Sequence, residues 1–206
     1  VIREIHRDVP EDVLRKFRVR IKDLGFEIRI RDIFLSENIG KAVEFKALVV
    51  RVSQVKQFLR RAIYICEVCG RVFPFETDEL YTRPRSCGYP DCRNTNPNKF
   101  ILSKEGQEFE EYQELIVQEL PEELPAGKLP ESCQVIIYGD LVDKVRPGDR
   151  IKITGIVHVI PERKLVEGRK PLFRVYVEAV HIEKPETEEE EIQLTEEEVE
   201  RILSLK

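Results

Sequence analysis

The sequence contains no methionine, no tryptophan and only three histidines among its 206 residues. It also lacks an apolar run long enough for a membrane span, which needs about 20 residues. The segment from Val1 to Asp12 is too charged to be a secretory signal peptide. We therefore expect a cytoplasmic protein with no membrane partner. The missing initiator methionine is expected of a processed chain or an excised fragment.

Familiar catalytic motifs are absent as well. The sequence has no G-x-x-x-x-G-K-[ST] of a P-loop ATPase, no G-x-S-x-G and no H-E-x-x-H. His6, His158 and His181 are separated in sequence, and the last two fall in strand-like segments, where histidine is more often structural than a ligand. We expect that this chain is not an enzyme by itself.

Charge is plentiful but unevenly spread. Charged residues make up 35% of the chain, above the usual quarter, and the net charge is −5. The stretch from Glu183 to Lys206 holds ten glutamates and three bases, which leaves a slight excess of bases in the rest. A mildly basic body with an acidic tail is compatible with a polyanionic partner.

Alternating apolar and polar residues predict a mainly β fold with little helix. Short strands separated by turn signals favour a barrel or a sandwich, and a five-stranded barrel with an insertion after its first strand suits the order. We expect a short helix over Pro10–Phe17 and the start of another at Thr195, where Glu198 completes a capping box. The predicted strands are Phe17–Lys22, Glu27–Asp32, Ala42–Lys56, Glu108–Leu120, Gln134–Tyr138, Arg150–Ile160 and Pro171–Glu183.

Four of the five cysteines form two pairs. Cys66 and Cys69 have the spacing C-x2-C, and Cys87 and Cys92 follow 17 residues later as C-x4-C. Two such turns predict a tetrahedral four-thiolate site, the geometry of structural Zn²⁺, with no open position for catalysis. Iron is an alternative metal, and a redox C-x-x-C is an alternative role that the second pair disfavours. Cys133 stands apart and is not expected to be a ligand.

Basic residues gather at two places. Arg163, Lys164, Arg169 and Lys170 cluster at the tip of the hairpin formed by the last two predicted strands, where they either bind a polyanion or simply keep a turn soluble. Arg51 and Lys56 lie on the long predicted strand, from which they can face a groove. The rings of Phe58, Tyr64 and Tyr112 are candidates for base stacking, although core packing is the commoner role.

Several segments occur in an order that resembles the N-terminal region of an archaeal minichromosome maintenance (MCM) replicative helicase. They are Val43–Lys56, the four cysteines, Val117–Pro130 and Gly139–Gly155, and the resemblance covers about Phe17 to Glu183. It implies an OB-fold barrel with a zinc-ribbon subdomain, assembled as a hexamer that encircles single- or double-stranded DNA in the nucleoid.

The resemblance also assigns roles to parts of the ring. It implies that zinc subdomains join two hexamers head to head, that the basic hairpin points into the channel, and that Arg51 and Lys56 belong to a single-strand-binding surface. The loop Leu120–Pro130 matches the allosteric control loop of the family. Ile116 and Glu131 stand where relatives often carry bases, which weakens the expected barrel-face contact more than the hairpin contact.

The domain plan that follows from the resemblance has four parts. Residues 1–40 form an N-terminal segment in which the helical subdomain of the family is short or missing. Residues 41–63 and 100–183 form the OB-fold, and residues 64–99 form the zinc-binding insertion. Residues 184–206 are an acidic linker and the start of a helix toward an ATPase domain that this chain does not include.

Two other functions fit the residues. The chain is alternatively a standalone zinc-containing OB-fold protein that binds single-stranded nucleic acid, or an assembly element that binds none. The acidic tail and the capping box at Thr195 resemble a junction, which disfavours the standalone protein. Particle size together with a DNA titration separates the assembly element from the others.

Overall fold

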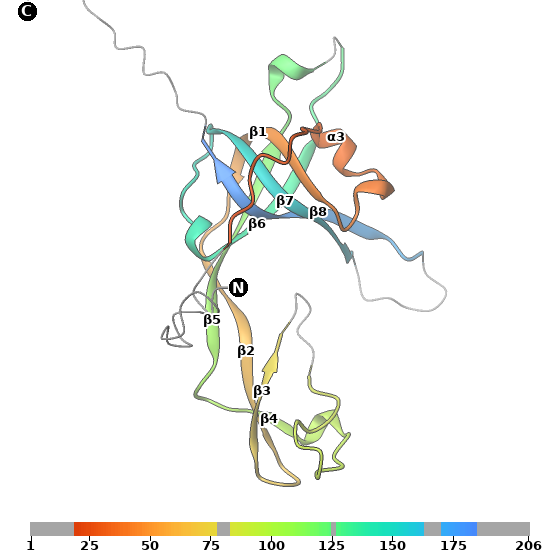
Figure 1. The fold of residues 1–206 in the computed structure, drawn as a ribbon, viewed down its shortest axis with the longest axis vertical. Coiled ribbons are helices and arrows are strands. Elements are labelled where there is room, and N and C mark those ends of the chain that lie inside the picture. The colour runs from red at the N-terminus through yellow and green to blue at the C-terminus, as the bar shows by residue number, and fades with distance from the viewer. Residues whose placement is uncertain (1–18, 78–82, 125–126, 163–169, 185–206) are drawn as a thin grey trace, which may run out of the picture.

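The computed structural model describes residues 19–77, 83–124, 127–162 and 170–184. Within these ranges the chain forms a barrel from which a long, narrow extension projects (Figure 1). The strands are β1 (Ala42–Val52), β2 (Lys56–Cys66), β3 (Val72–Glu76), β4 (Phe100–Leu102), β5 (Glu108–Gln118), β6 (Ser132–Tyr138), β7 (Arg150–Pro161) and β8 (Phe173–Glu183). The helical turns are α3 (Ile30–Ile33), η1 (Ser36–Asn38), η2 (Pro97–Lys99), η3 (Pro121–Glu123) and η4 (Gly139–Leu141).

Five strands close the barrel. Their order is β1-β7-β8-β6-β5, and the pairing of β1 with β5 completes the circle. Neighbours run antiparallel except β6 and β8, which pair in parallel through Val135 and Val177. This order and its one parallel pair confirm the predicted mainly β OB-fold barrel with a cysteine-bearing insertion.

Alternation along each strand fills the barrel interior. In β1, Phe45, Ala47 and Val49 are buried, and in β5 Leu115 and Val117 face the same core. Because side chains of successive residues point to opposite faces of a strand, the residues between them line the outer face. The apolar lining of the barrel therefore follows directly from the pattern in the sequence.

The predicted strand Glu27–Asp32 is wrong, since the structure has the one-turn helix α3 there. Ile30 and Ile33 are both buried against the barrel core, three residues apart on one helical face. Ile28 and Ile30 also alternate with charged residues, so the local sequence fits both periods. Contact with the barrel core, which the local pattern does not contain, favours the helical period.

The predicted strand Ala42–Lys56 is in fact two strands. A bulge follows Val49, β1 ends at Val52, and β2 begins at Lys56. Ser53 holds the break: its N–H donates to the carbonyl of Glu114 at 2.8 Å, and its Oγ accepts from the N–H of Glu114 at 2.9 Å. The alternation of apolar residues in the sequence does not predict that a serine hydrogen-bonds to the neighbouring strand and ends β1.

The remaining predictions of strands and helices concern segments near the two ends of the chain. Residues 19–22 of the predicted Phe17–Lys22 strand are not in a strand. The predicted helices at Pro10–Phe17 and from Thr195 lie outside the described residues. No helix in the described ranges is long and apolar enough to cross a membrane.

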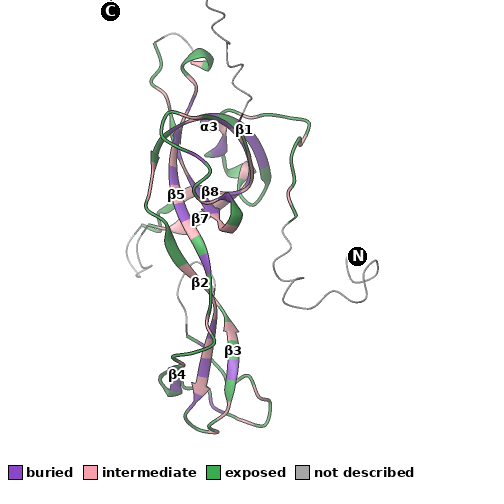
Figure 2. Ribbon diagram, turned by 90° about the vertical axis from the view of Figure 1, so that its left-hand side faces the viewer, coloured by how far each residue is buried: buried purple, intermediate pink, exposed green. Residues whose placement is uncertain are grey.

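The extension is built on two long strands. The first half of β5 pairs with β2 from Lys56↔Tyr112 onward, and the second half of β5 pairs with β1 and β6 in the barrel. Farther out, β2 pairs with β3 and β4. Figure 2 shows buried residues continuing along β2 and β3 to the far end of the extension. The four paired cysteines lie at that end, from Cys66, the last residue of β2, to Cys92, which precedes β4.

Candidate metal centre and nucleic-acid interface

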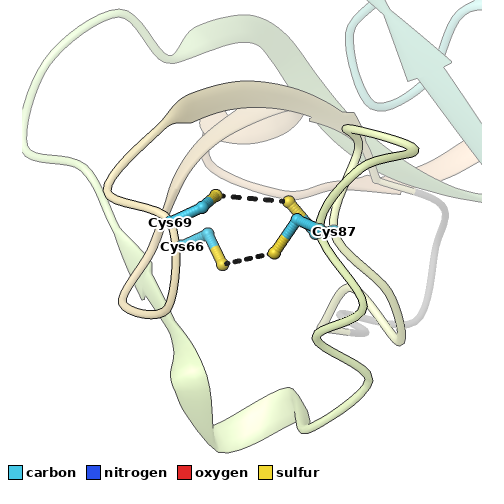
Figure 3. A group of neighbouring side chains, drawn as sticks. Cys66, Cys69 and Cys87 are labelled. Atoms are coloured by element: carbon cyan, nitrogen blue, oxygen red, sulfur yellow. Dashed lines mark hydrogen bonds between the residues drawn. The ribbon is translucent and has the colours of Figure 1, made fainter.

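The structure brings Cys66, Cys69, Cys87 and Cys92 together. Their four Sγ atoms all lie within 4.8 Å of one another. The Sγ atoms of Cys66 and Cys92 are 3.9 Å apart, and those of Cys69 and Cys87 are 3.8 Å apart. A tetrahedron with metal–sulfur bonds of about 2.3 Å has sulfur–sulfur edges of about 3.8 Å. The spacing therefore fits a tetrahedral four-thiolate metal site (Figure 3).

Two tight turns present these sulfurs. In the first cysteine turn, residues 66–71, the N–H of Cys66 donates to the carbonyl of Arg71 and the N–H of Gly70 donates to the carbonyl of Cys66. Gly70 has φ +70°, a conformation that glycine adopts without strain. In the second cysteine turn, residues 87–92, the N–H of Cys92 donates to the carbonyl of Tyr89. Backbone geometry thus fixes where each sulfur lies.

Arg71 joins the two cysteine turns. Its guanidinium pairs with the carboxylate of Asp91 at 2.6 Å and lies 4.2 Å from the centre of the Tyr89 ring. The hydroxyl of Tyr89 donates to the carbonyl of Val72 at 2.9 Å, back on the first side. These contacts outside the sulfur set hold the turns in register, as second-layer groups do around metal sites.

The surroundings of Cys66 and Cys69 favour thiolate, whereas burial raises the pKa of Cys87. Burial opposes ionisation of Cys66, but backbone N–H groups of the first cysteine turn and the amide of Asn94 outweigh it and lower the pKa of this thiol to about 6. The Asn94 Nδ2 lies 3.4 Å from the Cys66 Sγ. The backbone N–H of Arg71 lowers the pKa of Cys69. A thiolate is the form that binds metal.

A small apolar cluster supports the site. Ala62, Tyr64, Cys66, Phe73 and Phe100 are its buried members. The ring of Phe73 packs edge-on to Phe100 with centroids 5.7 Å apart. Gly88 is also built into this packing, because a Cβ there would lie 3.0 Å from the Phe73 ring. Tyr64 therefore belongs to a core, the commoner of its two expected roles.

Cys133 lies elsewhere, in β6, with its side chain in the barrel core. Burial raises the pKa of its thiol to about 12, so it stays protonated. His158 is in β7, stacked on Tyr176 with ring centroids 5.4 Å apart. Neither side chain belongs to the cysteine cluster.

Arg51 and Lys56 are both exposed on the barrel where β1 ends and β2 begins. Arg51 lies opposite Ile116 of β5, just after the bulge in β1. The Nζ of Lys56 is 4.0 Å from a carboxylate oxygen of Glu114, a loose and exposed pair. Exposed pairs of this kind contribute little to stability, so both cations are available to an anionic partner.

The hairpin of β7 and β8 carries the other predicted contacts. The two strands pair from Lys152↔Glu183 to Pro161↔Phe173, and residues 162–172 connect them in the sequence. Lys170 is exposed. Arg163, Lys164 and Arg169 lie outside the described residues, so the clustering of the four bases stays a prediction.

Sequence analysis named Phe58 and Tyr112 as candidate stacking rings but missed that they form an aromatic cluster with Tyr138 at the base of the extension. Tyr112 stacks with Phe58 at a centroid distance of 6.3 Å, and Tyr138 packs edge-on to both rings. The guanidinium of Arg60 lies 4.4 Å from the centre of the Tyr138 ring. The alternation of apolar and polar residues in β2, β5 and β6 indicates on which face of its strand each ring lies. It does not indicate that the three rings come into contact.

The segment expected to be a control loop has a closed base. The N–H of Glu119 donates to the carbonyl of Glu131 at 3.1 Å. The buried carboxylate of Glu119 accepts two bonds from the Arg31 guanidinium, at 2.8 and 2.6 Å, and one from the N–H of Glu131 at 3.1 Å. The Arg31 guanidinium holds the pKa of Glu119 down at about 2. This charge pair fixes the loop base to α3, which contains Arg31.

Comparison with known proteins identifies the barrel. Residues 29–161 match the family model described as the MCM OB domain. The chain is 32% identical over 198 residues to the minichromosome maintenance protein MCM of Saccharolobus solfataricus, covering 93% of this chain and 28% of that protein.

Eukaryotic proteins are similar over much of the same region. The chain is 35% identical over 183 residues to the DNA replication licensing factor mcm4 of Schizosaccharomyces pombe, covering 85% of this chain and 20% of that protein. It is 33% identical over 200 residues to the DNA replication licensing factor MCM7 of Arabidopsis thaliana, covering 94% of this chain and 28% of that protein. The chain thus spans between a fifth and just over a quarter of these relatives.

Proposed function

Because the chain belongs to the MCM family, we propose that it is the DNA-binding, ring-forming N-terminal region of a replicative DNA helicase. The observation that carries this proposal is the family match across the barrel, residues 29–161. The closed barrel and the four-cysteine extension are its physical support. In this proposal the region binds and positions DNA and performs no reaction itself.

The proposed DNA contacts are electrostatic. Arg51 and Lys56 are both exposed, and Arg163, Lys164, Arg169 and Lys170 belong to the segment that connects β7 and β8. Contacts of this kind go to phosphates, so binding is tolerant of sequence and weakens with salt. Both single- and double-stranded DNA are candidate partners.

We propose Zn²⁺ as the ion held by Cys66, Cys69, Cys87 and Cys92. Four protein thiolates at tetrahedral spacing fit zinc, and they leave no coordination position for a substrate. The ion therefore stabilises the extension and has no catalytic role.

The proposed assembly is a hexameric ring that encircles DNA at the nucleoid. Its extensions, each ending in a metal site, are the surfaces through which a second ring would join head to head. A protein that binds nucleic acid without forming rings is the standalone single-strand-binding alternative, and a ring that does not bind DNA is the assembly alternative.

A salt titration tests the hairpin. We expect Arg169→Ala with Lys170→Ala to weaken binding to a fluorescent single strand and to flatten the slope of log affinity against log salt by about 1 to 1.5, because each lost phosphate contact removes about 0.7. The matched control removes two exposed cations from the extension, Arg93→Ala with Lys104→Ala. An unchanged slope in the hairpin variant would remove the hairpin from the interface.

A further inference from the structure

A groove opens on the outer face of the barrel where the extension begins. Its lining includes Phe58 of β2, Tyr112 and Glu114 of β5, Tyr138 of β6, and Arg174 and Tyr176 of β8. We call it the aromatic groove. In β5, Leu115 and Val117 face the barrel core, so Tyr112 and Glu114 point to the opposite face. The aromatic groove is thus outside the barrel, beside the β7–β8 hairpin.

Three half-buried aromatic rings line the aromatic groove. Phe58 and Tyr112 are nearly parallel, with an interplanar angle of 25°, and Tyr138 stands at 63° to Tyr112. All three side chains are half-buried. The guanidinium of Arg60 lies 5.2 Å from the centre of the Phe58 ring and 4.4 Å from that of the Tyr138 ring. Flat rings that keep an accessible face are platforms on which nucleobases stack.

A buried polar atom at the same place has no partner. Tyr176 lines the aromatic groove and is 2% exposed. Its hydroxyl makes no hydrogen bond to any described residue. Buried hydroxyls in folded proteins are normally satisfied. This unsatisfied donor and acceptor is an observation independent of the rings, and it indicates that a polar group from outside the chain completes the site.

The charges around the aromatic groove are suited to a base inside and a phosphate outside. The carboxylate of Glu114 lies within it, held by the Tyr112 hydroxyl at 2.8 Å and the Gln134 amide at 3.0 Å. A carboxylate repels phosphate but accepts hydrogen bonds from the amino groups of a base. Arg174 is exposed and forms no ion pair with a described residue, and Lys170 is exposed nearby in sequence.

We propose that the aromatic groove holds one unpaired nucleobase of a single strand, stacked on the Phe58–Tyr112–Tyr138 rings, with its phosphate at Arg174. The proposal rests on the proposed DNA-binding function and deepens it. Phosphate contacts alone cannot distinguish a strand with bases from a strand without them. The aromatic groove makes that distinction and favours single strands, because a base in a duplex is already stacked.

Abasic DNA tests the stacking. The complete 206-residue chain is titrated by fluorescence anisotropy with a 20-nucleotide oligothymidylate and with an abasic strand of equal length. We expect about tenfold tighter binding of the strand with bases, as stacking of a single base provides. Tyr112→Ala should lose most of that difference and keep its affinity for abasic DNA. Tyr112→Phe, which retains the ring, should restore the preference.

Phe109→Ala is the matched control. Phe109 is an exposed aromatic residue of the same strand, on the face opposite to Tyr112, and it does not line the aromatic groove. Its replacement should leave the preference for bases unchanged. A second measurement needs no variant: a single strand with 5-iododeoxyuridine, cross-linked by light to the unmodified chain, should attach at Phe58, Tyr112 or Tyr138.

The outcomes separate the two proposals. Equal affinity for abasic and base-containing strands, or cross-links that all lie away from the three rings, overturns the aromatic groove as a base site and leaves the proposed DNA-binding function standing. Failure of the chain to bind either strand at any salt concentration overturns the proposed function and the base site with it.

Discussion

The barrel and its extension are stabilised in different ways. The barrel buries one cluster of 18 residues, whereas the extension buries a cluster of 5, one of which is the cysteine Cys66. The outer part of the extension also leaves Val68, Val72 and Ile101 about half exposed or more. Apolar burial is the main favourable term in folding, so the barrel has its own source of stability. In our proposal the extension is stabilised instead by a metal that its four cysteines hold.

Removal of the metal should produce the largest difference in stability between the extension and the barrel. We expect a chelator, or Cys66→Ser, to unfold the outer part of the extension and leave the barrel folded, because structural zinc contributes about 10 kcal/mol or more to folding of small domains. Hydrogen exchange followed by mass spectrometry checks this: amides of β3 and β4 should exchange rapidly, and those of β6 and β7 should stay protected.

The fifth cysteine provides the control for that experiment. Cys133→Ser should leave the metal content unchanged and destabilise the barrel, because Cys133 is buried in the barrel core. Loss of metal from this variant would show that the stabilities of the barrel and the extension are coupled. Rapid hydrogen exchange in the barrel after chelation would show the same.

Truncation of a barrel core residue should have the opposite pattern. Leu115 is fully buried in β5. We expect Leu115→Ala to reduce the free energy of unfolding of the barrel by about 2 to 5 kcal/mol, since it leaves a cavity in packed surroundings. Urea unfolding measures the loss, and metal analysis should find the metal still bound. An equal loss of metal would contradict the separation.

The Arg31–Glu119 pair should contribute less. Its guanidinium lowers the pKa of Glu119 to about 2 from an ordinary value of 4.5. The stability that this carboxylate adds is therefore present above about pH 4.5 and is lost as the pH falls toward 2. We expect Glu119→Gln to reduce the free energy of unfolding by roughly 2 to 3 kcal/mol at pH 7.

The pH dependence provides the check on Glu119. The difference between the parent chain and Glu119→Gln should shrink steadily below pH 4.5 in urea titrations, because protonation removes the same charge from the parent chain. A difference that stays constant from pH 7 to pH 3 would mean that ionisation of Glu119 contributes nothing.

Substitution of one glycine in the barrel and one in the extension compares how closely the two regions are packed. A Cβ on Gly155 of β7 would lie 2.5 Å from a methyl carbon of Val177 and 2.6 Å from the carbonyl oxygen of Glu178, whereas a Cβ on Gly88 would lie 3.0 Å from the Phe73 ring. We expect Gly155→Ala to cost about 1 to 3 kcal/mol, and Gly88→Ala to cost less. Thermal unfolding of the barrel and metal affinity, respectively, measure the two; a neutral Gly155→Ala would contradict close packing of β7 on β8.

Sequence patterns predicted the barrel well because its strands carry their own alternation. The predicted Gln134–Tyr138 and Arg150–Ile160 strands correspond to β6 and β7 within a residue or two at each end. The cysteine spacing likewise placed four sulfurs near one point. These features depend on residues close together in the chain, so local sequence contains the information.

Features that depend on distant segments were not predictable in the same way. The helical turn α3 exists because Ile30 and Ile33 meet the barrel core. The aromatic groove joins rings from three strands, and Tyr176 reaches it from a fourth. The partner of Arg31 is 88 residues away in sequence. In each case the deciding contact is tertiary, and the local pattern is equally consistent with another structure.

The strand β5 runs without interruption from the extension into the barrel wall. Its Glu108–Tyr112 half pairs with β2, and its other half pairs with β1 and β6. Rotation of the extension relative to the barrel would need a flexible connection, and a strand that is hydrogen-bonded in both regions provides none at this point. We therefore expect a displacement of the cysteine end of the extension to be transmitted along β5 to the barrel. It would pass Tyr112 and Glu114, which border the aromatic groove.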